Sequence, residues 1–241
     1  MPKLIIANWK TNFDLATGYK FIKQLSVNSY QSKIIIAAPH VMLSYLATEF
    51  PNMNFAAQDI SVYNNCGSKT GECSAKIVNS CGINYSIIGH SERRTFFKES
   101  NQMIKKKILN CYQSDITPII CIGEDVETRK KQKHLSYIKR QINALITEKC
   151  QHLIIAYEPV WSIGTGKIPT KDQINEVFSL IKDKVEGDEL ANCNDIVYGG
   201  SVDKDNYKSI LDIPLVSGLL IGSASLRINE FNKIISNIDH V

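Results

Sequence analysis

Short apolar runs recur along the chain at intervals that suit alternating strands and helices. Each run has four to six residues and does not alternate strictly between apolar and polar positions. That pattern is typical of parallel strands that are buried on both faces. Eight runs are predicted as strands, over residues 4–7, 33–38, 54–57, 85–88, 117–122, 153–157, 195–198 and 218–221.

Apolar residues near helical spacing occupy several of the gaps between these runs. Such spacing predicts an amphipathic helix that packs one face on a sheet. Helices are predicted over residues 13–27, 100–112, 126–146 and 170–185. The last of these opens with Thr170, which is a favoured helix N-cap residue.

Alternation of strand and helix over one domain length predicts an α/β fold. We expect a single domain, residues 1–241, folded as a closed (β/α)8 barrel with eight parallel strands and outer helices. An open doubly wound sheet is the alternative. That fold would favour a glycine-rich turn after its first strand, whereas the turn here reads Asn8-Trp9-Lys10-Thr11-Asn12.

Composition and charge limit the kinds of ligand and the cellular compartment that we expect for the protein. A net charge of +4 is too small to indicate nucleic-acid binding, but it suits a small anionic substrate. The seven cysteines include no Cys-x-x-Cys pair, which argues against a disulfide framework and a zinc site and favours a reducing cytoplasm. The first apolar run is too short for a signal peptide, and no segment approaches the length of a membrane span.

In a (β/α)8 barrel the chemistry belongs at the C-terminal ends of the strands. The residues there are Asn8 and Lys10 after the first run, His90, Ser91 and Glu92 after the fourth, Glu158 after the sixth, Gly199-Gly200-Ser201 after the seventh, and Gly222-Ser223-Ala224-Ser225 after the eighth. Taken singly, each has an ordinary explanation, such as a hydrogen-bonded histidine or a solvated lysine. Those explanations do not account for all of them lying at one end.

Two kinds of chemistry are indicated at this end of the barrel. Glu158 closes a buried strand, and the loop after it contains Gly164 and Gly166, so the loop could fold over the carboxylate and exclude water. The small residues after the last two strands suit phosphate, because backbone N–H groups can then approach it closely. The segment 164–167 lacks the upstream glycine of a P-loop.

Five motifs together resemble the triosephosphate isomerase family, in order and over essentially the whole chain. They are Asn8-Trp9-Lys10, Gly89-His90-Ser91-Glu92-Arg93-Arg94, Tyr157-Glu158-Pro159-Val160-Trp161, Gly164-Thr165-Gly166-Lys167 and Tyr198-Gly199-Gly200-Ser201-Val202. The resemblance implies a cytoplasmic enzyme of glycolysis and gluconeogenesis, usually a homodimer, with no cofactor or metal. It would interconvert dihydroxyacetone phosphate and D-glyceraldehyde 3-phosphate through an enediol or enediolate.

The resemblance also assigns roles to residues. Glu158 would be the base, and His90, Lys10 and Asn8 would stabilise the enediolate oxygen. His90 is expected as neutral imidazole, because a helix starting at Ser91 disfavours imidazolium. Ser91 would hold Glu158 while the loop is open, and Glu92 would pair with Lys10.

Further roles that the resemblance implies concern phosphate, the lid and dimerisation. Asn8, Lys10 and the amides of Gly164, Ser201, Gly222 and Ser223 would bind the substrate. The lid would include Pro159, Val160, Trp161, Gly164, Thr165, Gly166, Lys167 and Pro169. A loop with Thr70, Gly71 and Glu72 would reach the partner subunit, where Thr70 would lie near Asn8 and Lys10.

Some positions depart from the family pattern. Ser223 stands where a second glycine is usual, Ile168-Pro169 replaces the usual end of the lid, and Asp59 stands where asparagine is common. Two rival interpretations remain open. Another phosphate-binding barrel enzyme would share the small-residue turns but not the set Lys10, His90 and Glu158. A barrel that serves only surface binding would be expected to have lost at least one of those three residues.

Overall fold

The computed structural model describes residues 3–25, 32–64, 67–146, 150–163, 167–187, 191–236 and 238. Eight parallel strands close into a barrel in sequence order, and β1 completes the ring by pairing with β8. The strands are β1 (Leu4–Asn8), β2 (Lys33–Ala38), β3 (Asn54–Ala57), β4 (Tyr85–Ile88), β5 (Thr117–Ile122), β6 (Cys150–Tyr157), β7 (Ala191–Tyr198) and β8 (Gly218–Ile221). The predicted closed (β/α)8 barrel is therefore confirmed.

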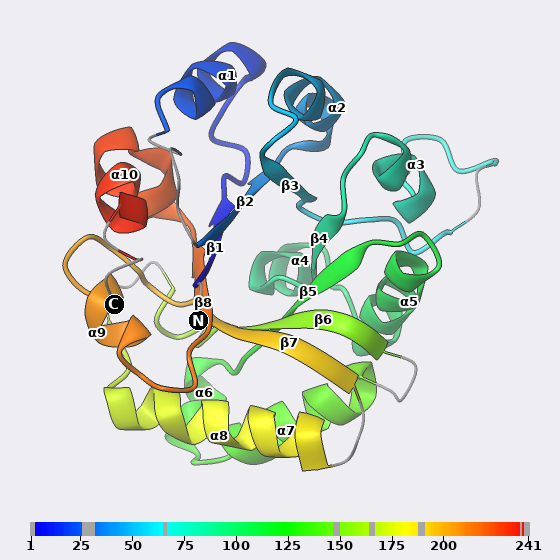
Figure 1. Ribbon diagram of the computed structural model, residues 1–241. Helices are drawn as coiled ribbons and strands as arrows, with labels where there is room; N and C mark the ends of the chain where they lie inside the picture. The colour runs from blue at the N-terminus through cyan, green and yellow to red at the C-terminus, as the bar shows by residue number, and fades with distance from the viewer. Residues whose placement is uncertain are drawn as a thin grey trace.

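Helices surround the barrel on its outside (Figure 1). They are α1 (Leu15–Lys23), α2 (His40–Glu49), α3 (Ala75–Ser80), α4 (Ser91–Phe96), α5 (Asn101–Tyr112), α6 (Val126–Lys130), α7 (His134–Leu145), α8 (Lys171–Gly187), α9 (Tyr207–Leu211) and α10 (Ile228–Ser236), with a 3-10 helix, η1 (Ser223–Leu226). No helix in the described part of the chain is both long and apolar enough to span a bilayer.

Both faces of the strands are buried, as the apolar runs predicted. Alternate residues such as Leu4 and Ile6 fill the barrel interior, while Ile5 and Ala7 pack toward the helices. Alternation of this kind follows from the two-residue repeat of a strand. The interior is thus a packed core, and the polar side chains that follow the strands are left at its C-terminal end.

Several predicted boundaries differ from the structure. The helix expected over 13–27 corresponds to α1, which spans Leu15–Lys23. The strands expected from residues 153 and 195 begin earlier, at Cys150 and Ala191. The helix expected over 126–146 is two helices, α6 and α7, because Gln132 lies between them with φ 53°. A left-handed residue cannot continue an α-helix.

Candidate active site

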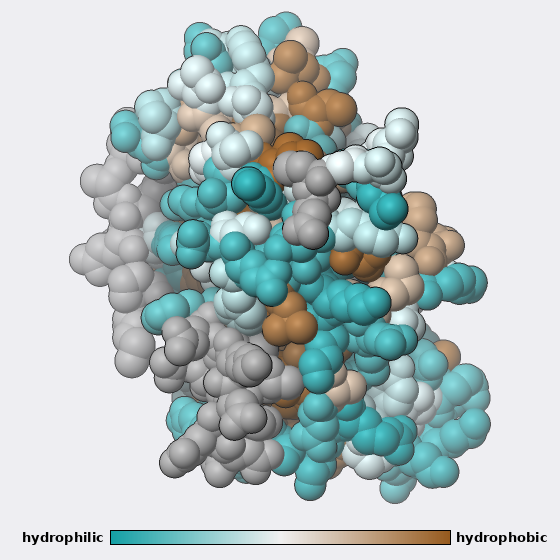
Figure 2. Space-filling model, turned by 90° about the vertical axis from the view of Figure 1, so that its right-hand side faces the viewer, coloured by the Kyte–Doolittle hydropathy of each residue, from teal (hydrophilic) through white to brown (hydrophobic). Residues whose placement is uncertain are grey.

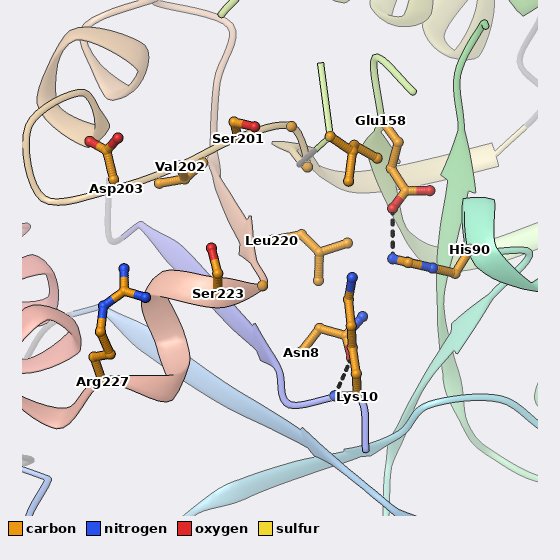
Figure 3. A pocket seen from close by; sticks show the side chains of 14 residues that line it. Asn8, Lys10, His90, Glu158, Ser201, Val202, Asp203, Leu220, Ser223 and Arg227 are labelled. Carbon is orange, nitrogen blue, oxygen red and sulfur yellow. Dashed lines mark hydrogen bonds and ion pairs between the residues drawn. The ribbon is translucent and has the colours of Figure 1, made fainter. Parts of the chain in front are cut away.

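A cavity of about 380 Å³ lies at the C-terminal ends of the strands (Figure 3). It is lined by Asn8, Lys10, His90, Glu158, Ile163, Gly199, Gly200, Ser201, Val202, Asp203, Leu220, Gly222, Ser223 and Arg227. Figure 3 shows His90 and Glu158 at one end, Ser201 and Ser223 toward the other, and Lys10 pointing in between them. The cavity therefore brings the Glu158 carboxylate, the His90 imidazole and the Lys10 ammonium together with the two small-residue turns.

Glu158 is held at the end of β6 by backbone groups of Ile122 in β5 and Ser91 in α4. Its amide donates to the carbonyl of Ile122 at 2.7 Å, and Gly123 allows this approach, since a Cβ there would lie 1.7 Å from the Glu158 carbonyl oxygen. The residue is 2% exposed, and Oε2 of its carboxylate accepts a hydrogen bond from the Ser91 amide at 2.9 Å. The predicted meeting of Ser91 and Glu158 is present, and the Ser91 group that makes it is the backbone amide.

His90 sits between Glu158 and the start of α4. Its Nε2 lies 3.0 Å from Oε1 of Glu158, and its Nδ1 accepts from the Glu92 amide at 3.2 Å. Because Nδ1 accepts an N–H, the ring proton belongs on Nε2, where it points to Glu158. The helix start therefore fixes both the orientation of the ring and its tautomer.

Lys10 projects from a strained turn that follows β1. The residue has φ 51°, and two hydrogen bonds hold this conformation: its amide donates to Oδ1 of Asn8 at 3.1 Å, and its carbonyl accepts from Nε2 of Gln58 at 2.7 Å. A left-handed non-glycine residue persists only where its surroundings enforce it, and such residues gather at functional sites. The ammonium pairs with Oε1 of Glu92 at 2.6 Å, as expected.

The charges in this group shift one another's protonation. Burial raises the pKa of Glu158. The contact with His90, the Ser91 amide and the charge of Lys10 together lower it by more, so the net pKa lies below the ordinary value. Burial lowers the pKa of His90, whereas Glu158 raises it, and with Glu158 in contact the net pKa is raised. Glu158 is thus kept ionised, and the charge on His90 depends on where that carboxylate lies.

The segment after Glu158 is anchored by a buried carboxylate that the sequence analysis did not single out. Glu124 accepts from the indole Nε1 of Trp161 at 2.8 Å and from the Tyr157 hydroxyl at 3.1 Å. The start of the expected lid is therefore held in place, over Pro159, Val160 and Trp161. At the far end Lys167 is exposed and Pro169 is buried, one residue before Thr170, which caps α8 by accepting from the Gln173 amide at 3.2 Å. Gly164, Thr165 and Gly166 lie outside the described residues.

The two small-residue turns face the same cavity. The hydroxyl of Ser201 donates to the carbonyl of Ser162 at 2.7 Å, which joins the turn after β7 to the start of the lid segment. Gly222 precedes η1, whose first residue is Ser223. Ser223 is not among the residues with positive φ, so its Cβ is accommodated without backbone strain.

Sequence reasoning missed several residues of the cavity. Apolar Ile163, Val202 and Leu220 form part of its wall, and Asp203 and Arg227 also line it. The apolar residues give no signal in sequence because they resemble core positions. Among the described residues, no group of three His, Cys, Asp or Glu side chains is placed to hold a metal ion.

The loop with Thr70, Gly71 and Glu72 projects from the side of the barrel rather than into this cavity (Figure 1). Its base is tied by the Ser61 amide, which donates to the Cys73 carbonyl at 2.9 Å, and by the Ser61 hydroxyl, which donates to Glu72. Thr70 is exposed. The structure thus does not bring Thr70 to the Asn8 and Lys10 of its own chain.

Comparisons with known proteins identify the family of the chain. The family model described as triosephosphate isomerase matches residues 3–238. The chain belongs to the triosephosphate isomerase family. The protein named triosephosphate isomerase from Orientia tsutsugamushi (strain Boryong) is 38% identical over 246 residues, which cover 99% of this chain and 98% of that protein. The one from Francisella philomiragia subsp. philomiragia is 37% identical over 251 residues, covering 100% and 99%.

Proposed function

We propose that this triosephosphate isomerase family member interconverts dihydroxyacetone phosphate and D-glyceraldehyde 3-phosphate, a step of glycolysis and gluconeogenesis. The observation that carries the proposal is the convergence of Glu158, His90 and Lys10 on one cavity beside the two small-residue turns. Moving a carbonyl by one carbon requires a base beside the carbonyl and donors for the oxygen that becomes negative. Those groups are the ones assembled here.

Glu158 is proposed as the base. Its carboxylate removes a proton from the carbon beside the carbonyl and returns it to the neighbouring carbon. The proton of the substrate hydroxyl passes to the former carbonyl oxygen in the same conversion, so ketose becomes aldose. In the structure both carboxylate oxygens are occupied, one by His90 and one by the Ser91 amide. Glu158 must therefore leave these contacts to reach a substrate, and its place directly before Pro159 links that movement to the lid.

His90, Lys10 and Asn8 are proposed to stabilise the enediolate. With its proton on Nε2, His90 can donate to either substrate oxygen from one position, and the ammonium of Lys10 supplies positive charge. Once substrate separates Glu158 from the ring, burial, the charge of Lys10 and the Glu92 amide at Nδ1 all favour neutral imidazole. The Glu92 carboxylate acts in the opposite direction and raises the pKa of His90.

Phosphate is proposed to bind the amides of Ser201, Gly222 and Ser223, together with Gly164 from the lid. Backbone amides at the start of a short helix suit an anion, and small side chains keep the approach open. The lid, residues 159–169, would then close over the substrate. Exclusion of water strengthens every charge interaction in the cavity and protects the enediolate phosphate from elimination.

We also propose that the protein is a cytoplasmic homodimer. Apolar side chains are exposed in the segments that follow β2 and β4: Val41 is 91% exposed, Phe96 72% and Phe97 62%. Figure 2 shows the side of the molecule that carries α3 and α5, where hydrophobic residues form separate patches on a mainly hydrophilic surface. Exposed apolar groups of this size support an interface with a second copy. Absence of disulfide patterning in the sequence supports the compartment.

A coupled assay tests the reaction. Purified protein should convert D-glyceraldehyde 3-phosphate to dihydroxyacetone phosphate, followed through a dehydrogenase that reduces the ketone with NADH. The matched control is Glu158→Gln, which keeps the shape of the side chain and removes the base. If wild-type protein shows no more isomerisation than this variant, the proposal is wrong, and one of the two rival barrel interpretations applies.

A further inference from the structure

The phosphate end of the cavity contains charges that the proposed chemistry does not use. Figure 3 shows Arg227 and Asp203 on the same side, close to Ser223 and away from His90 and Glu158. Arg227 and Lys10 are the positively charged residues among those that line the cavity. Because Lys10 pairs with Glu92 near the reacting groups, Arg227 is the cation of the phosphate end.

Asp203 makes that end less favourable for an anion. Its Oδ1 accepts from the amides of Asp205 at 2.8 Å and Asn206 at 2.9 Å, which fixes the carboxylate in the turn after β7. This turn also carries Ser201. A carboxylate lining the cavity repels a phosphate dianion, so a cation beside it is needed to restore attraction.

Glu230 holds Arg227 in position for this role. Its Oε2 accepts from Nε of Arg227 at 2.5 Å and also pairs with Nη2, while its Oε1 accepts from the Lys204 amide at 3.2 Å. Glu230 thus links the turn after β8 to the turn after β7. A guanidinium has five N–H donors, so those of Nη1 stay available, and the Arg227 side chain is 60% exposed.

We propose that Arg227 is a substrate-capture residue of the phosphate subsite, and that Glu230 sets its strength by holding and partly neutralising it. This inference rests on the proposed function and adds a residue to it. Capture through an exposed charge acts on the free enzyme and dianion, so it raises kcat/KM and leaves the chemical step alone. Exposed ion pairs contribute modestly, so an effect of about two- to fivefold is expected.

The test compares four variants at low and high salt. Arg227→Gln should raise KM for glyceraldehyde 3-phosphate about two- to fivefold, with little change in kcat, and Arg227→Lys should recover part of the loss. Glu230→Gln should shift KM the opposite way, because it removes a negative charge from the guanidinium. Lys208→Gln is the matched control: it removes the same charge from an exposed site on α9 that does not line the cavity.

Three readouts separate capture from a structural effect. Near 1 M salt, where the screening length falls to about 3 Å, the difference between Arg227→Gln and wild type should largely vanish. Isomerisation of glyceraldehyde, which lacks the phosphate, should be unchanged by Arg227→Gln. Calorimetric titration with inorganic phosphate should show weaker binding to Arg227→Gln, and this measurement does not depend on isomerase activity.

The outcomes decide the inference separately from the proposed function. It is overturned if Arg227→Gln behaves like Lys208→Gln, if its loss persists at high salt, or if glyceraldehyde turnover falls equally. A wild-type protein that does not isomerise triose phosphates would contradict the proposed function. In that case, the phosphate titration alone decides whether Arg227 captures the anion.

Discussion

The carboxylate of Glu158 is fixed by two contacts of similar length, 3.0 Å to His90 and 2.9 Å to the Ser91 amide. Glu158→Asp shortens the side chain by one methylene and withdraws the carboxylate by about 1 Å, an error that can reduce a rate about a hundredfold. We therefore expect kcat in the coupled assay to fall by about that factor, with a much smaller change in KM.

The control for this variant is Glu127→Asp, which makes the same change at an exposed position of α6. It should retain wild-type kinetics. If Glu158→Asp stays within about threefold of wild type, a loss too small for a misplaced base, the assignment of Glu158 is wrong.

The protonation of His90 should follow the position of Glu158. The carboxylate favours imidazolium and raises the pKa of His90 against the effect of burial. Glu158→Gln removes this charge, so the pKa of His90 should fall relative to wild type. Ring ¹⁵N chemical shifts measured over a pH titration would report it. An unchanged or higher pKa in the variant would mean that another group sets the charge on His90.

At the scale of elements, the structure makes the two ends of the lid segment unequal. The start is tied to Glu124 through Trp161, while the end passes through buried Pro169 into the cap of α8. Proline fixes its own φ and restricts Ile168 before it, so the proposed lid would have fewer open conformations to lose on closing.

Pro169→Ala should therefore weaken binding of a transition-state mimic. The loss of backbone restriction corresponds to about 0.4–1 kcal/mol, which is about two- to fivefold in affinity. Isothermal calorimetry with an enediolate analogue measures it, with Pro51→Ala, an exposed turn position, as the control. Equal affinity in Pro169→Ala and wild type would place the flexible point of the lid elsewhere.

Most strands could be predicted from the sequence because a buried strand is marked by its own run of apolar residues. Six of the expected runs match strands to within one residue, since strands buried on both faces are apolar throughout. The early starts of β6 and β7 were missed because their first residues, such as Gln151 and Asn194, interrupt the apolar pattern. The division of α6 from α7 was missed because nothing in the residue type of Gln132 requires positive φ.

The candidate site was predictable in part for a similar reason. Residues that follow strands, such as Lys10, His90 and Glu158, could be assigned to the C-terminal end of the barrel from topology alone. Glu124 and Arg227 could not, because their roles depend on contacts across the fold with Trp161 and Glu230. Pairings of this kind leave no periodic signal in the chain.

At the scale of the whole molecule, dimerisation should depend on the projecting loop. Thr70→Arg places a long charged side chain at its exposed tip, where a partner surface would have to bury the added charge. We expect sedimentation velocity to show a shift from dimer to monomer, with a parallel loss of activity.

Thr48→Arg, the same change at an exposed site on α2, serves as the control and should remain dimeric. Wild-type protein that sediments only as a monomer at micromolar concentration would contradict the dimer itself. A dimeric Thr70→Arg variant with full activity would instead show that the loop tip lies outside the interface.

The pairing of β1 with β8 has a consequence for how the protein is made. Leu4 lies opposite Gly218, whose missing side chain is required because a Cβ would lie 1.9 Å from the Leu4 carbonyl oxygen. During synthesis Lys10 leaves the ribosome well before Gly222 and Ser223. The edge of β1 that pairs with β8 therefore stays open until β8 has been made, even though the other edge can pair with β2 much earlier. The site cannot bind substrate during that interval, and the open edge is accessible to chaperones for as long.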